Sequence, residues 1–108
     1  MRLIPSHRVS THPGEILAEE FLAPFALTQV ELAARLGIPF QRVNQIVRGR
    51  RAVTPDTALR LSRFLGTTPE FWLNLQQTFD LSAALLSPAG RKIRRIRPLA
   101  RTRARNTR

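Results

Sequence analysis

Three helix-start signals constrain the fold of this chain more than any other feature of its sequence. Thr28 is followed three residues later by Glu31, which is the capping-box pattern. Thr54 and Thr68 each precede a proline and then an acidic residue, the usual order of an N-cap and a first helical turn. Gly37 follows the first of these segments, where a glycine can end a helix in the left-handed conformation. This punctuation predicts short helices joined by tight turns, and no stretch alternates as a strand would.

Apolar residues at helical spacing extend this pattern to five helices. A further helix is predicted from His12-Pro13-Gly14 to Pro24, and another from Pro39 to Val47. A chain of 108 residues with 43% hydrophobic content supports one small domain. We therefore expect an all-α fold in three parts: an N-terminal arm at 1–11, a five-helix domain at 12–81 and a basic, flexible tail at 82–108.

The charge of the chain is divided unevenly between these parts. Residues 1–80 hold nine basic and all seven acidic residues, whereas residues 81–108 hold nine basic residues and no acid, out of a net charge of +11. This division excludes a uniformly basic, histone-like protein. A run like the one at 91–108 is most often solvated, but it could also follow DNA phosphates without sequence preference. Within this run, Ile93, Ile96 and Leu99 recur at every third position, which also leaves open a short helix that forms on a partner.

Several classes of function are excluded by what the sequence lacks. The chain has no cysteine and only two histidines, so we expect no disulfide, no thiolate nucleophile and no metal or other cofactor. His12 with Glu15 and Glu19 is better explained as a solvated helix start than as a metal site. No set of histidine, nucleophile and acid suggests an enzyme, and no apolar run is long enough to span a membrane. The expectation is a soluble cytoplasmic protein without catalytic activity.

The spacing of small and branched residues between 29 and 48 points to a specific motif. Ala33, Gly37, Val43 and Ile46 lie four, eight, fourteen and seventeen positions after Gln29. Two closely crossing helices need a small residue at the contact, a glycine at the turn and branched residues on the second helix. The segment 28–48 is therefore predicted to be a helix-turn-helix, whose second helix enters the major groove of DNA.

The outer face of that second helix carries side chains that can read DNA. Gln and Asn side chains can pair with adenine, and Arg with guanine or with a phosphate. Gln29 is placed to donate to a phosphate beside the free amides of its helix N-terminus. A plain solvated face is the alternative that this combination of residues makes less attractive. The predicted DNA-binding residues are Gln29, Phe40, Gln41, Arg42, Asn44, Gln45, Arg48, Arg50 and Arg51.

Two sets of sequence segments resemble known families. The segments TQVELAARLG at 28–37 and QRVNQIVRGRRAVT at 41–54 resemble the Cro/repressor-type (XRE) helix-turn-helix class. The segments HPGEIL at 12–17 and TPDTALRLSRFLGTTPEFWLNLQ at 54–76, with Asp80-Leu81, resemble the HigA-type antitoxins, also called the VapI family. The resemblance covers residues 12–81 and implies a five-helix, lambda-repressor-like fold.

The resemblance also implies two activities. An antitoxin of this type neutralises an mRNA endonuclease of the HigB/RelE type and represses the shared operon as a homodimer bound to operator DNA. The resemblance further implies base contacts for Gln41, Asn44 and Gln45. It implies phosphate contacts for Gln29, Arg42, Arg48 and Arg50.

The sequence departs from the repressor pattern at the start of the second helix of the motif. Ile38-Pro39 replaces the usual Ser or Thr cap, so this helix is expected to begin without a side-chain cap. Phe40 stands where many repressors have a polar base contact; it could touch a thymine methyl group or be an exposed apolar residue.

Two further surfaces are assigned to protein partners. The last predicted helix has more aromatic residues than so small a core can hold, so Phe71, Trp72, Leu75 and Phe79 are expected to form a dimer interface as well as core. An acidic face on the first helix is usually only solvated, but it would suit docking of a cationic toxin. Its residues are Glu15, Glu19 and Glu20.

Two alternative functions remain open at this point. The chain could be a stand-alone Cro-type repressor, which a neighbouring gene for a small basic protein would argue against. It could also be a nucleoid or RNA-binding protein that acts through its arginine-rich tail, in which case sequence preference would be slight.

Overall fold

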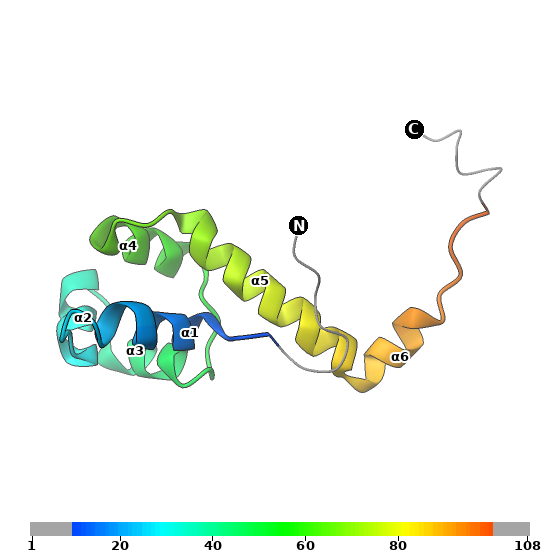
Figure 1. Ribbon diagram of the computed structural model, residues 1–108, viewed down its shortest axis with the longest axis horizontal. Coiled ribbons are helices and arrows are strands. Elements are labelled where there is room, and N and C mark those ends of the chain that lie inside the picture. The colour runs from blue at the N-terminus through cyan, green and yellow to red at the C-terminus, as the bar shows by residue number, and fades with distance from the viewer. Residues whose placement is uncertain (1–9, 101–108) are drawn as a thin grey trace.

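The computed structural model describes residues 10–100, and within that range every regular element is helical (Figure 1). This result confirms the all-α prediction. Residues 1–9 of the predicted arm and 101–108 of the predicted tail lie outside the described range. The elements in chain order are α1 (Pro13–Ile16), η1 (Leu17–Leu22), α2 (Gln29–Leu36), α3 (Phe40–Val47), α4 (Pro55–Leu65), α5 (Pro69–Leu86) and α6 (Pro88–Arg94).

The three predicted helix starts are all present. Thr28 and Glu31 form a reciprocal capping box: the Glu31 amide donates to Thr28 Oγ1 at 3.0 Å, and the Thr28 amide donates to Glu31 Oε1 at 2.9 Å. Thr54 and Thr68 accept from the amides three residues later in α4 and α5. Each cap satisfies an amide that the helix itself leaves without a partner, which fixes where the helix begins.

The first predicted helix is present, with a change of winding in its second part. The Gly14 amide donates to His12 Nδ1 at 2.9 Å, so His12 is the side-chain cap of α1. From Leu17 the chain is wound as a π-helix, and the Ala23 amide donates to the Ala18 carbonyl at 3.0 Å, five residues back. η1 ends at Leu22, before Pro24, as the missing proline amide requires.

One hydrophobic core joins α1, η1 and the four helices that follow. Its largest fully buried side chains include Trp72, Leu17, Leu32, Ile46 and Leu61. Burial of such a side chain stabilises the fold by about 1.5–3 kcal/mol. The indole N–H of Trp72 donates to the Thr67 hydroxyl at 2.7 Å, so the tryptophan is buried without an unpaired polar group.

Gln76 connects α5 to the loop before α4 from inside the protein. This side chain is only 6% exposed. Its Oε1 accepts from the Val53 amide at 2.9 Å, and its Nε2 donates to Asp80 Oδ1 at 2.9 Å. The loop amide is buried, so Gln76 supplies the partner that water would otherwise provide.

The C-terminal part of the structure differs from the sequence-based prediction. The domain was expected to end at residue 81 and to be followed by a tail, but α5 continues to Leu86 and is followed by α6. No helix-breaking residue interrupts the chain between Pro69 and Ser87-Pro88, where α5 ends and α6 begins. Figure 1 shows α5 leaving the body formed by α1–α4 and carrying α6 at its far end, in a molecule of 57 × 30 × 22 Å.

Candidate nucleic-acid interface

α2 and α3 form the predicted helix-turn-helix, and its four spacing positions have the predicted environments. Gly37 is left-handed, with φ +70°, and allows the chain to reverse between the helices. Ala33 is 5% exposed, and Val43 and Ile46 are each 2% exposed. Gly14 of α1 also lies so close to α3 that a Cβ there would overlap the carbonyl of Ile46. Close contacts with two helices therefore fix the orientation of α3.

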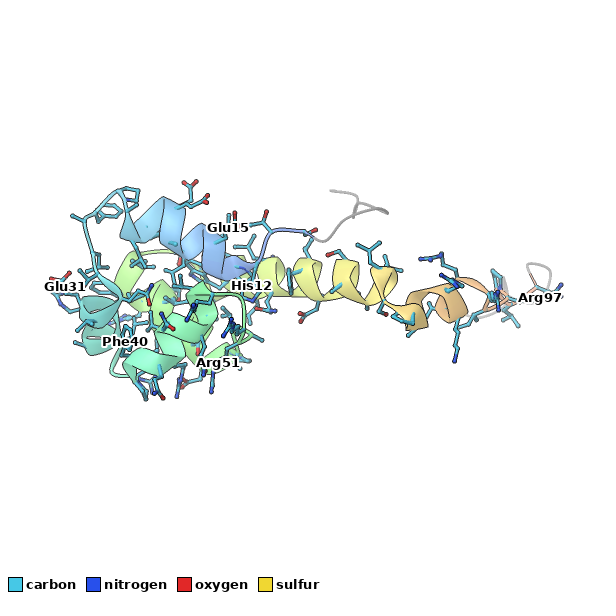
Figure 2. The ribbon with its side chains drawn as sticks, turned by 90° about the horizontal axis from the view of Figure 1, so that it is seen from below. His12, Glu15, Glu31, Phe40, Arg51 and Arg97 are labelled. Atoms are coloured by element: carbon cyan, nitrogen blue, oxygen red, sulfur yellow. The ribbon has the colours of Figure 1, made fainter. Side chains whose placement is uncertain are left out.

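The face of α3 opposite the buried Val43 and Ile46 is open to solvent. Gln41, Gln45 and Arg48 are exposed, and Arg42 and Asn44 are half-buried. Figure 2 labels Phe40 and Arg51, whose side chains lie along the same edge of the molecule. Phe40 is 45% exposed at the start of α3, and Pro39 provides no side-chain cap there, as the sequence indicated.

Asn44 and Gln29 are paired by a hydrogen bond between α3 and α2. Asn44 Nδ2 donates to Gln29 Oε1 at 2.9 Å. The bond uses one N–H of Asn44, so the other N–H and the Oδ1 acceptor remain, and together they match the edge of an adenine. It also leaves the Nε2 donors of Gln29 for a phosphate beside the N-terminus of α2. The geometry thus brings together two residues that the sequence analysis assigned to different kinds of DNA contact.

Gln45 is held in a similar way from the turn after α3. Arg51 Nε donates to Gln45 Oε1 at 2.9 Å across the exposed surface. The Nε2 donors of Gln45 stay open to solvent. Gly49, with φ +74°, turns the chain so that Arg51 comes back toward α3.

Arg42 has a partner that the sequence analysis did not find. Arg42 Nη1 lies 3.2 Å from Asp56 Oδ2, and Arg60 Nε lies 3.0 Å from the same oxygen. The hydrogen bond from Arg60 and then the nearby charges of both arginines hold the pKa of the Asp56 carboxyl below its usual value. Arg60 Nη1 also donates to the Leu36 carbonyl at 2.8 Å, so this group of side chains joins α2, α3 and α4. Only the Asp56–Arg60 spacing of four residues could have been recognised in the sequence.

Comparisons with known proteins agree with this geometry. A family model described as Helix-turn-helix matches residues 19–72. Virulence-associated protein I of Dichelobacter nodosus is 49% identical over 73 residues, which are 68% of this chain and 68% of that protein. The solved structure of Pseudomonas aeruginosa antitoxin HigA with the higBA promoter is 39% identical, with a TM-score of 0.79, and the match covers 83% of this chain and 98% of that one. This chain belongs to the HigA/VapI-type helix-turn-helix family.

The solved structure of antitoxin GraA in complex with its operator extends the likeness of this HigA-type chain beyond the motif. It is 44% identical, with a TM-score of 0.80, and the match covers 92% of this chain and 99% of that one. Likeness over that share of the chain confirms the fold expected from the resemblance, including helices that do not belong to the motif.

Trp72 does not lie at a surface, which corrects one member of the expected dimer interface of this HigA-type chain. Its exposed fraction is 0%, and the rings of Phe21 and Phe71 pack against it at centroid distances of 5.4 and 4.9 Å. Phe71 is 38% exposed, while Leu75 and Phe79 are half-buried. Two more apolar residues of α5 are exposed that were not predicted from the sequence, Leu81 at 47% and Leu86 at 39%.

The acidic residues assigned to toxin docking are all exposed. Glu15 lies in α1, and Glu19 and Glu20 lie in η1. Figure 2 places Glu15 on the opposite edge of the molecule from Phe40 and Arg51. Among residues 10–100, no cluster of three acidic or histidine side chains could hold a metal ion. No helix in the same range is long and apolar enough to cross a membrane.

Proposed function

We propose that this HigA-type chain is the antitoxin of a two-gene toxin–antitoxin pair and the repressor of its own operon. The exposed polar face of α3, with the Asn44–Gln29 pair at its centre, is the observation that carries the proposal. The solved complexes of HigA with the higBA promoter and of GraA with its operator support operator binding.

The DNA-binding roles follow from the donors and acceptors that each side chain still has free. Gln41, Asn44 and Gln45 read base edges in the major groove, and Phe40 contacts a thymine methyl group. The side chains that hold the phosphate backbone and set the position of α3 are Gln29, Arg42, Arg48, Arg50 and Arg51.

The protein acts on DNA as a homodimer that pairs α5 with α5 of a second copy. Exposed apolar side chains run along α5 from Phe71 to Leu86, whereas the buried Trp72 only supports this face from inside. A two-fold dimer presents two copies of α3 to two half-sites about one DNA turn apart, near 34 Å. The domain that dimerises extends from residue 12 to 86, with the N-terminal arm before it.

The acidic face is the docking surface for the toxin. A HigB/RelE-type mRNA endonuclease must be cationic to hold RNA, and Glu15, Glu19 and Glu20 offer it the opposite charge. Glu15 of this face lies on the opposite edge of the molecule from Phe40 of α3 (Figure 2), so one antitoxin can hold the toxin and the operator together. The protein is cytoplasmic, needs no cofactor and catalyses no reaction itself.

Two measurements on the full chain test this proposal. A duplex from upstream of its gene and a scrambled duplex of equal composition are titrated in parallel, and tighter binding to the upstream duplex is expected. Co-expression with the neighbouring gene product and pull-down tests the toxin. Equal affinity for both duplexes would contradict the repressor role, and absence of a co-purifying neighbour would contradict the antitoxin role.

A further inference from the structure

The segment from α6 to residue 100 is a separate basic surface that neither operator reading nor toxin docking uses. Its sequence between 88 and 100 contains no acidic residue and no Asn, Gln, Ser or Thr. Within residues 10–100, neither ion pair involves this segment. All of its basic side chains are exposed: Arg91, Lys92, Arg94, Arg95 and Arg97.

Specific contacts hold α6 against the end of α5. Gly90 is buried in the corner between them, and a Cβ at this position would overlap the carbonyl of Leu85. Arg94 Nη1 donates to the same carbonyl at 3.0 Å, and the Ser87 hydroxyl donates to the Ala84 carbonyl at 2.6 Å. Arg94 therefore anchors the corner, so that α6 presents Arg91 and Lys92 on a fixed support, and Arg95 and Arg97 follow directly after the helix.

The basic surface lies far from the recognition helix. Figure 1 shows α6 and α3 toward opposite ends of the molecule, and Figure 2 shows Arg97 beyond α6 at the end away from Phe40. The long axis measures 57 Å, and one turn of B-DNA rises about 34 Å. The two helices cannot share the same few base pairs, but both can reach one duplex about a turn apart.

We propose that α6 and residues 95–97 bind the phosphodiester backbone of duplex DNA beside the base pairs that α3 reads. The inference rests on the proposed binding of DNA by α3. The cationic side chains of this segment fit phosphates. The segment has no amide or hydroxyl side chain to read a base edge, and its basic residues are the only ones whose side chains could bond to a base. This contact therefore adds affinity without sequence preference.

Two other occupants fit this surface less well. A cationic toxin would be repelled by a segment that carries only positive charge. A lipid surface needs a continuous apolar face as well as charge, and the exposed Ile93, Ile96 and Leu99 do not form one, because Ile96 and Leu99 lie beyond the end of α6 and basic residues stand between them.

The test uses the full chain with four charges removed and the corner kept. The variant carries Arg91→Gln, Lys92→Gln, Arg95→Gln and Arg97→Gln, while Arg94 remains to hold Leu85. Affinity for a scrambled duplex of about 40 base pairs is measured over a salt series, and the slope of log affinity against log salt should fall by about 0.9 for each phosphate that the variant no longer neutralises. On a hairpin duplex of about 8 base pairs, which is shorter than one turn and therefore too short for α3 and α6 to occupy together, the slope should stay the same.

A second variant controls for general loss of charge. Arg35→Gln with Arg63→Gln removes two exposed cations from α2 and α4, and it should leave both slopes as they are. Equal melting temperatures would show that all three proteins fold alike. An unchanged slope on the long duplex, or an equal drop on both duplexes, would overturn the proposal.

Binding to anionic vesicles separates lipid from DNA. Loss of vesicle binding in the four-charge variant with an unchanged DNA slope would overturn the proposal in favour of a membrane contact. The salt slope on scrambled DNA does not depend on operator recognition. If the wild-type chain failed to prefer its upstream duplex, the proposed function would fail while this test still gave its own result.

Discussion

At the scale of single residues, the side chains that organise this protein are polar ones whose partners lie far away in the sequence. Gln29, Asn44 and Gln45 were predicted to bind DNA because their chemistry suits it, and the structure shows that Asn44 and Gln29 are bonded to each other. Neither a role for Gln76 nor a partner for Arg42 was evident from the sequence. The Gln76 bond joins α5 to the loop before α4, and the Arg42 ion pair joins α3 to α4, across 23 and 14 residues of sequence, so no local pattern encodes them.

Replacing Gln76 tests how much its buried bond contributes. Gln76→Met keeps the volume of the side chain but leaves the Val53 amide buried without an acceptor, so the free energy of unfolding should fall by about 1–3 kcal/mol. Denaturant titration measures the change, with Gln77→Met on the exposed side of α5 as the control. Equal stability of the two variants would show that the Gln76–Val53 bond does not stabilise the fold.

His12 makes the stability of the protein depend on pH. Burial holds the pKa of its ring below the ordinary value of 6.5, although the charge of Asp80 opposes this shift. The unfolded chain therefore binds the proton first, and stability should be complete above pH 6.5 and decline as the pH falls through the window between 6.5 and the lower folded pKa. Protonation at Nδ1 would also remove the acceptor for the Gly14 amide.

Thermal melting between pH 7.5 and 5.5 measures this dependence, relative to a variant that cannot titrate at this position. His12→Asn keeps a side-chain acceptor at the N-cap and should flatten the curve. If the variant lost stability toward pH 5.5 as steeply as the wild type, His12 would not be the group responsible.

At the scale of helices, the sequence predicted where a helix begins better than where it ends. The caps at Thr28, Thr54 and Thr68 are local hydrogen bonds, so their residues alone revealed them. The extent of α5 and the presence of α6 were missed. Gly90 packs on Leu85, only five residues back, and Ser87-Pro88 has the cap-and-proline order of Thr54-Pro55 and Thr68-Pro69, so the sequence did carry a local signal for the start of α6.

The contact between α2 and α3 gives a direct test of the motif geometry. Ala33→Leu should overpack the crossing of the two helices and lower stability by about 1–3 kcal/mol. Ala34→Leu, at the next and exposed position of α2, should change it little. Denaturant titration of both variants is the measurement, and a similar effect at the two positions would contradict the close packing at Ala33.

At the scale of the whole molecule, the acidic surface and the basic surface lie in different places. Glu15 of the acidic face lies on the opposite edge of the molecule from Phe40 of α3 (Figure 2), and the basic α6 lies at the far end of α5 (Figure 1). The uneven charge of the two parts of the chain was evident from the sequence. Their positions in space were not, because they depend on the length and direction of α5.

Reversing the acidic face should separate the two proposed activities. The combined change Glu15→Lys, Glu19→Lys and Glu20→Lys should slow toxin association by like-charge repulsion and leave DNA binding intact or slightly stronger. Growth of toxin-expressing cells reports the first effect, and a band shift reports the second. Full rescue of growth by the triple variant would place the toxin site on another surface.

The central claim is that the outer face of α3 reads operator sequence. The most direct measurement is a parallel titration of upstream and scrambled duplexes with the variant that combines Gln41→Ala, Asn44→Ala and Gln45→Ala. The preference of the wild type for the upstream duplex should disappear, at about 1–3 kcal/mol for each base that the variant no longer reads, while affinity for the scrambled duplex and the melting temperature stay close to wild type. A variant that kept its preference for the upstream duplex would contradict the assignment of α3 as the reading helix.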